Sequence, residues 1–240
     1  MEMSRYLELI RQDEQRLAAA AAGNLQRRVP PCPEWSVQDL VEHVGHVYLH
    51  KVECMRRQQP PEPWPPPEHG RDPLEWLAEQ TEVMLTELVE RGPDAPAYTW
   101  HEPDQTVGFW YRRMAQETAV HRVDAELAVG AHTPVDAELA LDGVDELLDI
   151  MFAGDWSDDP QPDLSGRVAL RAADRTWLVV MEPDRVTIEP EISNADATVS
   201  TEPSDLLLWL WRRLPLAAAT LDGDRAAADR LYRRLALATE

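Results

Sequence analysis

The stretch WYRRMAQETAVHRVDAELAVG, residues 110–130, combines apolar and titratable side chains at helical spacing. At about 100° per residue, one narrow stripe of the helix carries Trp110, Met114, Glu117, His121 and Asp124. Because a tryptophan and a methionine share this stripe, we expect it to face inward rather than toward solvent. A buried carboxylate and a buried imidazole need a partner, and a metal ion is one such partner.

Two explanations of the Glu117–His121 pair are open at this point. Side chains four residues apart leave the same face of a helix, one turn apart, and a solvated pair of this kind is common. In a metal site the two residues would be ligands, and Asp124 would accept the second ring N–H of His121. A metal site would also need a third ligand from elsewhere in the chain.

Composition restricts the class of protein. The 240 residues suffice for one large domain or two modest ones, and the formal net charge is -21. This acidity argues against nucleic acid and anionic membranes as partners, because phosphate groups bind basic surfaces. Two cysteines are too few for a disulfide framework, and we expect both Cys32 and Cys54 to be structural. With no bilayer-spanning apolar run and no signal-peptide pattern, a soluble cytoplasmic protein is expected, either a monomer or a homodimer.

Helical periodicity recurs through the first 157 residues. Besides the helix in 110–130, apolar spacing predicts helices over residues 3–28, 37–55, 73–91 and 136–153. Ser36 is expected to cap the helix that begins at residue 37, with Asp39 in its first turn. The proline-rich residues 58–72 are predicted to form a surface loop that Trp64 holds down, with His69 exposed.

Three histidines lie on the predicted helix 37–55. Measured from the centre of its apolar stripe, His43 is nearest the buried edge and His46 is nearly opposite. His46 is therefore expected to face solvent. A weak surface metal site formed by His46 and His50, which are four residues apart, is an alternative.

Beyond residue 157 the pattern changes to period two. Alternating or clustered β-forming residues predict strands over 167–173, 176–182, 185–191 and 197–200, followed by helices over 203–214 and 224–237. The expected fold class is therefore α plus α+β, with a helical bundle in residues 1–157 and a small α+β domain in residues 158–240.

Three blocks of sequence carry a resemblance to a known family. They are CPEWSVQDLVEHVGHVY at 32–48, QETAVHRVDAELAVG at 116–130 and DATVSTEPSDLLLWLWRRLP at 196–215. In this order, along nearly the whole chain, they resemble the mycothiol-dependent maleylpyruvate isomerase family. The resemblance implies a DinB-like metal-binding four-helix bundle, followed by a smaller α+β domain similar to sterol carrier proteins. It is much less specific for any one substrate.

The same resemblance implies a metal site and a thiol cofactor. Carried over residue by residue, the family's metal ligands match His43, Glu117 and His121. Two imidazoles and one carboxylate suit Zn²⁺ or another divalent metal, with a fourth position open. The implied cofactor is mycothiol, whose metal-bound thiolate would attack a small electrophilic substrate. Isomerisation, conjugation and S-transfer are all compatible with this nucleophile.

An anionic substrate or cofactor would need a cationic partner. Candidates are Arg112, Arg113 and Arg122 near the metal helix, and Arg212, Arg213 and Arg225 in the second domain. Among these, Arg113 is a candidate catalytic residue together with Asp124, and Arg212 and Arg213 are candidates for binding the cofactor. Two other interpretations stay open. One is a non-catalytic metal- or small-ligand-binding module of a stress response. The other is a structural bundle whose Glu–His cluster is a hydrogen-bonded network without metal.

Overall fold

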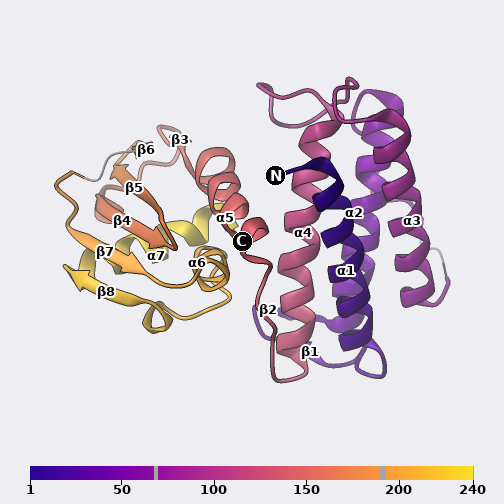
Figure 1. Cartoon of the computed structure of the whole chain (residues 1–240), viewed down its shortest axis with the longest axis horizontal. Coiled ribbons are helices and arrows are strands. Elements are labelled where there is room, and N and C mark those ends of the chain that lie inside the picture. The colour runs from indigo at the N-terminus through magenta and orange to yellow at the C-terminus, as the bar shows by residue number, and fades with distance from the viewer. Residues whose placement is uncertain (68–69, 190–192, 240) are drawn as a thin grey trace. The chain divides into compact units, whose positions relative to one another are not determined.

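The computed structural model describes residues 1–67, 70–189 and 193–239, and it divides into two compact units, Met1–Thr133 and Pro134–Glu240 (Figure 1). The sequence placed the change of domain at residue 157, whereas residues 134–157 belong to the second unit. The physical reason is local packing. Helix α5 (Ala137–Glu146) packs on α6 (Pro203–Leu210), and the Val135 N–H donates to the Ser204 hydroxyl at 2.9 Å.

The first unit is a four-helix bundle, as predicted, with a small two-stranded sheet (Figure 1). Its elements are α1 (Met3–Ala21), β1 (Arg28–Val29), β2 (Cys32–Ser36), α2 (Val37–Arg57), α3 (Pro73–Arg91) and α4 (Val107–Ala128). Helix α4 contacts all three other helices of the bundle, and most of its side chains are buried. The helix that carries Glu117 and His121 is therefore the most buried of the bundle.

Helix α1 is shorter than predicted. It ends at Ala21 rather than near residue 28, because Gly23 adopts a positive φ of 73° and the Asn24 side chain donates to the Ala20 carbonyl. The chain then continues into β1, which pairs antiparallel with β2. This turn returns the chain to the start of α2.

A capping box fixes the first turn of α2, as the sequence predicted for Ser36. The Asp39 N–H donates to the Ser36 hydroxyl at 3.2 Å, and the Ser36 N–H donates to the Asp39 carboxylate at 2.8 Å. Hydrogen bonds from Ser36 hold the pKa of Asp39 below its ordinary value, although burial acts in the opposite direction. The cap defines where α2 begins, and so where His43 lies along it.

Helices α2 and α3 approach each other closely at a glycine. A Cβ added at Gly45 would lie 2.3 Å from a ring carbon of Trp76 on α3. Both residues are buried. The indole ring therefore occupies the space that any larger residue at position 45 would need.

The second unit contains a six-stranded sheet in the order β3-β6-β5-β4-β7-β8, in which only the β4–β7 pair is parallel (Figure 1). Its strands are β3 (Gly154–Asp155), β4 (Gly166–Ala172), β5 (Arg175–Glu182), β6 (Arg185–Glu189), β7 (Ala197–Ser200) and β8 (Thr220–Gly223). Helices α6 and α7 (Arg225–Thr239) pack against β4. A π-helix, Leu147–Phe152, continues α5, and short 3₁₀ turns span Pro162–Leu164 and Leu216–Ala218.

The four predicted strands correspond to β4, β5, β6 and β7, and the α+β class is confirmed. Strand β3 was not predicted, because two residues are too short to show a period-two pattern. Strand β8 was not predicted, because its sequence TLDG ends in Asp222 and Gly223, two residue types that are uncommon in strands. Helix α6 ends at Leu210 rather than near residue 214, where Arg212 adopts a positive φ of 60°. The predicted exposure of His69 and the end of the predicted strand 185–191 lie outside the described residues.

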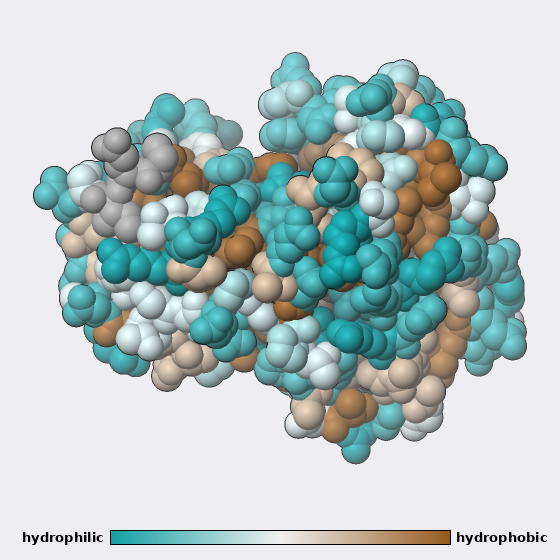
Figure 2. All heavy atoms as spheres, viewed as in Figure 1, coloured by the Kyte–Doolittle hydropathy of each residue, from teal (hydrophilic) through white to brown (hydrophobic). Residues whose placement is uncertain are grey.

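Hydrophilic side chains cover most of the face of each unit that Figure 2 draws, in keeping with the acidic composition. Within the part of the chain that the structure describes, no helix combines the length and the apolar character that crossing a membrane requires.

The contact between Gly45 and Trp76 leads to a stability prediction. We expect Gly45→Ala to lower the free energy of unfolding by about 1–3 kcal/mol, because the new methyl group overpacks the α2–α3 interface. This cost exceeds the roughly 0.5–1 kcal/mol that alanine gains over glycine inside a helix. Urea denaturation measures the difference.

The matched control introduces the same substitution into a Trp76→Leu background, where the ring is gone. There, Gly45→Ala should be neutral or stabilising. An equal loss in both backgrounds would contradict the steric explanation.

Candidate metal centre

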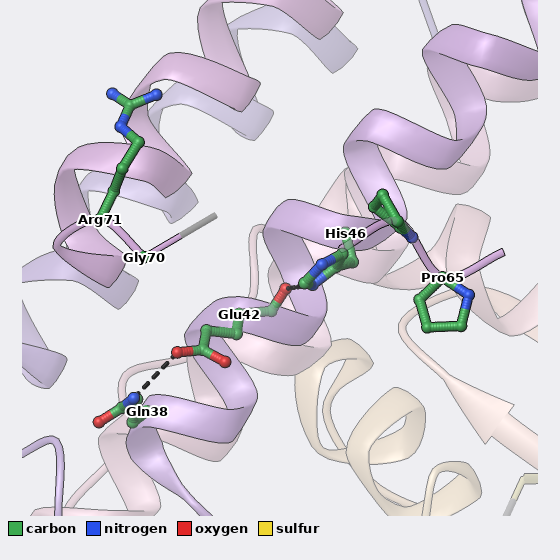
Figure 3. A pocket seen from close by; sticks show the side chains of 7 residues that line it. Gln38, Glu42, His46, Pro65, Gly70 and Arg71 are labelled. Carbon is green, nitrogen blue, oxygen red and sulfur yellow. Dashed lines mark hydrogen bonds between the residues drawn. The ribbon is translucent and has the colours of Figure 1, made fainter. Parts of the chain in front are cut away.

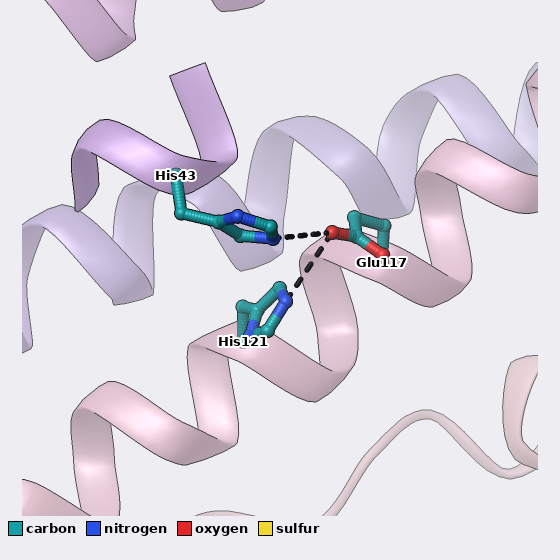
Figure 4. A group of neighbouring side chains, drawn as sticks. All are labelled: His43, Glu117 and His121. Carbon is teal, nitrogen blue, oxygen red and sulfur yellow. Dashed lines mark hydrogen bonds and ion pairs between the residues drawn. The ribbon is translucent and has the colours of Figure 1, made fainter. Parts of the chain in front are cut away.

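Three side chains from two helices of the bundle converge on one point (Figure 4). His43 reaches it from α2, while Glu117 and His121 reach it from α4, one turn apart. Their nearest donor atoms all lie within 4.8 Å of one another. Glu117 Oε1 lies 3.2 Å from the Nε2 atom of His43 and 3.2 Å from the Nε2 atom of His121.

The cluster is only partly open to solvent. The side chains of His43, Glu117 and His121 are 35%, 16% and 11% exposed. The Trp35 ring, on β2, lies 4.7 Å from the His43 ring and 6.4 Å from the His121 ring, measured between centroids. His43 is therefore the most accessible member, and the indole forms a wall beside both imidazoles.

Sequence reasoning did not assign Trp35 to the site. The available signal was its place one residue before the N-cap Ser36, because that cap sets the direction in which β2 meets α2. A tryptophan in the strand that precedes a ligand-bearing helix is therefore positioned to line the site.

Two further residues of α4 hydrogen-bond to members of the cluster on the side away from its centre. Asp124 is fully buried and accepts a hydrogen bond from His121 Nδ1 at 2.9 Å, which leaves Nε2 facing the cluster. Arg113, whose side chain is 6% exposed, donates to Glu117 Oε2 at 2.8 Å, which leaves Oε1 facing the two imidazoles. Both residues thus contact a ligand directly, and their catalytic role stays a prediction.

The charges in the cluster shift two pKa values in opposite directions. Burial alone would raise the pKa of Glu117, but the charge and hydrogen bonds of His121, the hydrogen bond from His43 and the charge of Arg113 lower it well below its ordinary range. Burial would lower the pKa of His121, but Glu117 and Asp124 together raise it to about 9. Without a cation, the cluster is therefore a carboxylate paired with an imidazolium.

The donor set fits a divalent metal ion. In a tetrahedral Zn²⁺ site with ligand distances of about 2.0–2.1 Å, neighbouring donor atoms lie roughly 3.3 Å apart. Two of the three donor pairs are 3.2 Å apart, and all lie within 4.8 Å. The buried carboxylate of Asp124 on the far nitrogen of His121 is the arrangement that usually orients a metal-bound imidazole. Among the described residues, His43, Glu117 and His121 are the one group of three or more His, Cys, Asp or Glu side chains that could hold a metal ion.

His46 lies in a different environment from His43, although not the solvated one predicted. Its ring packs 4.7 Å from the Trp76 ring, and its Nδ1–H donates to the Glu42 carbonyl at 2.7 Å. It lines a pocket of about 400 Å³ together with Gln38, Glu42, Pro65, Pro66, Gly70 and Arg71 (Figure 3). None of the three converging side chains lines this pocket, so His46 is separate from the candidate metal centre.

The other arginines suggested by the sequence have different surroundings. Arg122 is fully buried and forms ion pairs with Asp13 on α1 at 3.2 Å and with Glu126 at 2.9 Å, so its position is structural. Arg213, in the second unit, donates to the Trp211 carbonyl, and Arg212 lies over the Tyr232 ring. Their assignment as cofactor ligands stays a prediction.

The raised pKa of His121 leads to a prediction for the metal-free protein. Because the folded-state pKa of about 9 exceeds the ordinary value of 6.5, protonation of His121 stabilises the fold fully below pH 6.5. This contribution is lost as the pH rises through 9. We expect an NMR titration of the imidazole protons to show His121 with a midpoint near 9.

The control for this titration is Asp124→Asn, which keeps the shape of the side chain but removes its charge. The midpoint of His121 should then fall, because one of the two carboxylates that stabilise the imidazolium is gone. A midpoint near 6.5 in the unsubstituted protein would contradict the described charge arrangement.

Comparison with known proteins agrees with this architecture. The family model "Mycothiol maleylpyruvate isomerase N-terminal domain" matches residues 7–126, and the "MDMPI C-terminal domain" model matches residues 138–230. No curated protein matches the chain.

Solved structures with the same fold include a mycothiol-dependent maleylpyruvate isomerase and a histidine-to-alanine mutant of such an enzyme. They are 12% and 11% identical, each with a TM-score of 0.55 over 87% of this chain and 88% of that chain. A UbiJ-SCP2 ubiquinone synthesis protein also matches, with 19% identity over 45% of this chain and 96% of that chain, but its TM-score of 0.32 supports no conclusion.

The two family models lie in sequence order and correspond to the helical bundle and to the α+β unit. The first alone spans half of the 240 residues. This chain therefore belongs to the mycothiol maleylpyruvate isomerase family.

Proposed function

We propose that this protein is a metal- and thiol-dependent isomerase or S-transferase that acts on a small electrophilic substrate. The observation that carries the proposal is the convergence of His43, Glu117 and His121 within 4.8 Å in a bundle of this family. Two imidazoles and one carboxylate are the usual protein ligands of a catalytic zinc ion, which keeps a further position open. Zn²⁺ or another divalent metal suits this ligand set.

In this proposal, each side chain of the site has a separate role. His43 Nε2, His121 Nε2 and Glu117 Oε1 hold the metal. Asp124 keeps the Nδ1 proton of His121 and so fixes the ring orientation. Arg113 holds the second oxygen of Glu117 and balances its charge. A bound divalent metal would supply Lewis acidity that lowers the pKa of a coordinated thiol toward neutrality.

The reacting thiol comes from a cofactor rather than from the chain. Of the two cysteines, Cys54 is fully buried, and burial raises the pKa of its thiol, so it is a poor nucleophile. Cys32 is partly exposed on β2 and is not one of the three side chains that converge at the candidate metal centre. The related solved enzyme is named as mycothiol-dependent, which supports mycothiol as the cofactor of this chain. The substrate would be an electrophile with a double bond or a leaving group.

Isomerisation is the version of this chemistry that the family favours. Addition of the thiol to a cis double bond, rotation about the resulting single bond and elimination of the thiol would return the cofactor unchanged. Conjugation would stop after the addition, and S-transfer would displace a leaving group. Maleylpyruvate, which names the related enzyme, is the first substrate to test.

The ligand assignment predicts which histidine variants lose metal. His121→Ala and His43→Ala should each reduce bound metal from about one equivalent to well below it, because each removes one of three protein ligands. Elemental analysis of protein purified after loading with Zn²⁺ measures the content. His46→Ala is the matched control on the same helix and should keep full occupancy.

Full metal occupancy in His121→Ala would contradict the ligand assignment. Loss of metal in His46→Ala alone would mean that the other face of α2 binds the cation.

The catalytic proposal predicts a double requirement for turnover. Conversion of maleylpyruvate should need both a divalent metal and mycothiol, and Glu117→Gln should lower the rate by at least roughly 100-fold because a charged ligand is lost. The measurement is product formation by chromatography, with metal-free protein and thiol-free reactions as controls. Metal and thiol binding without turnover of any electrophile would favour the non-catalytic binding module.

A further inference from the structure

Lysine occurs once in this chain. The sequence contains 23 lysine and arginine residues, and Lys51 is the single lysine among them. It lies on α2 and is only partly exposed. The only lysine amine of the protein is thus not fully exposed. On the exposed surface, arginine supplies the positive charge.

The surroundings of Lys51 leave its charge without a local carboxylate. Its Nζ lies 5.1 Å from the centre of the Trp110 ring and 3.2 Å from His50 Nδ1. Among the residues that the structure describes, no carboxylate forms an ion pair with it. Arg113 and Arg122 differ in this respect, because each is paired with a carboxylate of α4.

Lys51 lies along the same contact between α2 and α4 that contains the candidate metal centre. His43 meets Glu117 and His121, while Lys51 meets Trp110, so the two helices run antiparallel along this contact. Eight residues of helix separate His43 from Lys51, a rise of about 12 Å.

The electrostatics show that Lys51 and the ligand cluster act on each other. Burial lowers the pKa of Lys51, and the positive charge of Arg113 adds to this, while Cys54 and Glu117 act in the opposite direction. The net shift is downward. The groups already present around Lys51 therefore do not fully compensate the ammonium charge, and an additional anion would.

We propose that Lys51 binds a carboxylate of the substrate, so that the substrate of this enzyme is a small anionic electrophile. An ammonium group offers three donors, and a half-buried one attracts a carboxylate more strongly than a solvated one does. The reactive end of the substrate would lie at the metal centre and its carboxylate at Lys51, farther along the contact between α2 and α4. The proposal rests on the proposed function, because it assigns the far end of the same site.

A structural role for Lys51 makes different predictions. Its aliphatic stem could simply cover the Trp110 ring, as long cationic side chains often do. In that case Lys51→Met would retain the packing and leave anion binding unchanged. Measuring affinity for an anion therefore distinguishes the two explanations, whereas measuring stability does not.

The first experiment uses the unsubstituted protein and depends on its single lysine. A short pulse of an acetylating reagent modifies Lys51 and the N-terminal amine, and peptide mass spectrometry quantifies each. Maleate is the probe, because it is a small cis-alkene with two carboxylates, and neutral dimethyl maleate is the control. Maleate should slow acetylation of Lys51 by about tenfold at saturation and leave the N-terminal amine unaffected.

The second experiment compares variants by calorimetric titration with maleate. Lys51→Met should weaken binding by about 10–100-fold, the range for a lost hydrogen bond to a charged group. Lys51→Arg should restore most of the affinity because it keeps the charge. Arg57→Met, an exposed cation on the same helix, is the matched control and should bind maleate as the unsubstituted protein does.

Both experiments are carried out on metal-loaded and on metal-free protein. Protection of Lys51 and weaker binding in Lys51→Met, also without metal, support the proposal independently of the metal site. Absence of bound metal in the unsubstituted protein would instead contradict the proposed function. Unchanged acetylation of Lys51 in maleate, or equal maleate affinity in Lys51→Met, would overturn the role of Lys51.

Discussion

The constraint on which this structure depends is the placement of one carboxylate, that of Glu117, between two helices. One of its oxygens faces imidazoles from both α2 and α4, and the other accepts a hydrogen bond from Arg113. Removing a carboxylate from water is costly unless such partners are in place. The spacing of the two helices must therefore keep His43 within reach of Glu117.

The rest of the bundle can be understood as support for that spacing. The capping box at Ser36 sets the start of α2, and the close approach at Gly45 sets its distance from α3. Tyr48 shares a hydrogen bond with Thr118 on α4 at 2.5 Å, one turn beyond His43 and one residue beyond Glu117. Apolar packing, backbone capping and a buried polar contact thus all position α2, the helix that carries His43.

Much of this arrangement could be predicted from the sequence, because several signals were local. The N-cap at Ser36 and the inward stripe of Trp110, Met114 and Asp124 are confirmed, since each depends on spacing within one helix. The four helices of the bundle and the four longer strands follow from strong periodicity. Membership of the family is confirmed by the two family models. The role of His43, Glu117 and His121 as metal ligands stays a prediction.

The predictions differed from the structure where tertiary contacts or very short elements determine it. His46 is partly exposed, but its ring also packs against Trp76, thirty residues further on, a contact that helical spacing alone does not show. The division at Thr133 depends on packing between α5 and α6, which lie far apart in sequence. Lys51 was overlooked because its lack of a carboxylate partner is a property of two packed helices rather than of one. A list of the cationic residues in the sequence does not show which of them are paired with a carboxylate.

The buried guanidinium of Arg122 has a consequence for the motions of the bundle. It bonds to Asp13 on α1, to Glu126 near the end of α4 and to the Thr133 carbonyl at the last residue of the first unit. Helix ends are normally the first parts of a fold to fray. Here the final turns of α4 are tied on both sides, so local unwinding that begins in the segment after the bundle stops before it reaches His121.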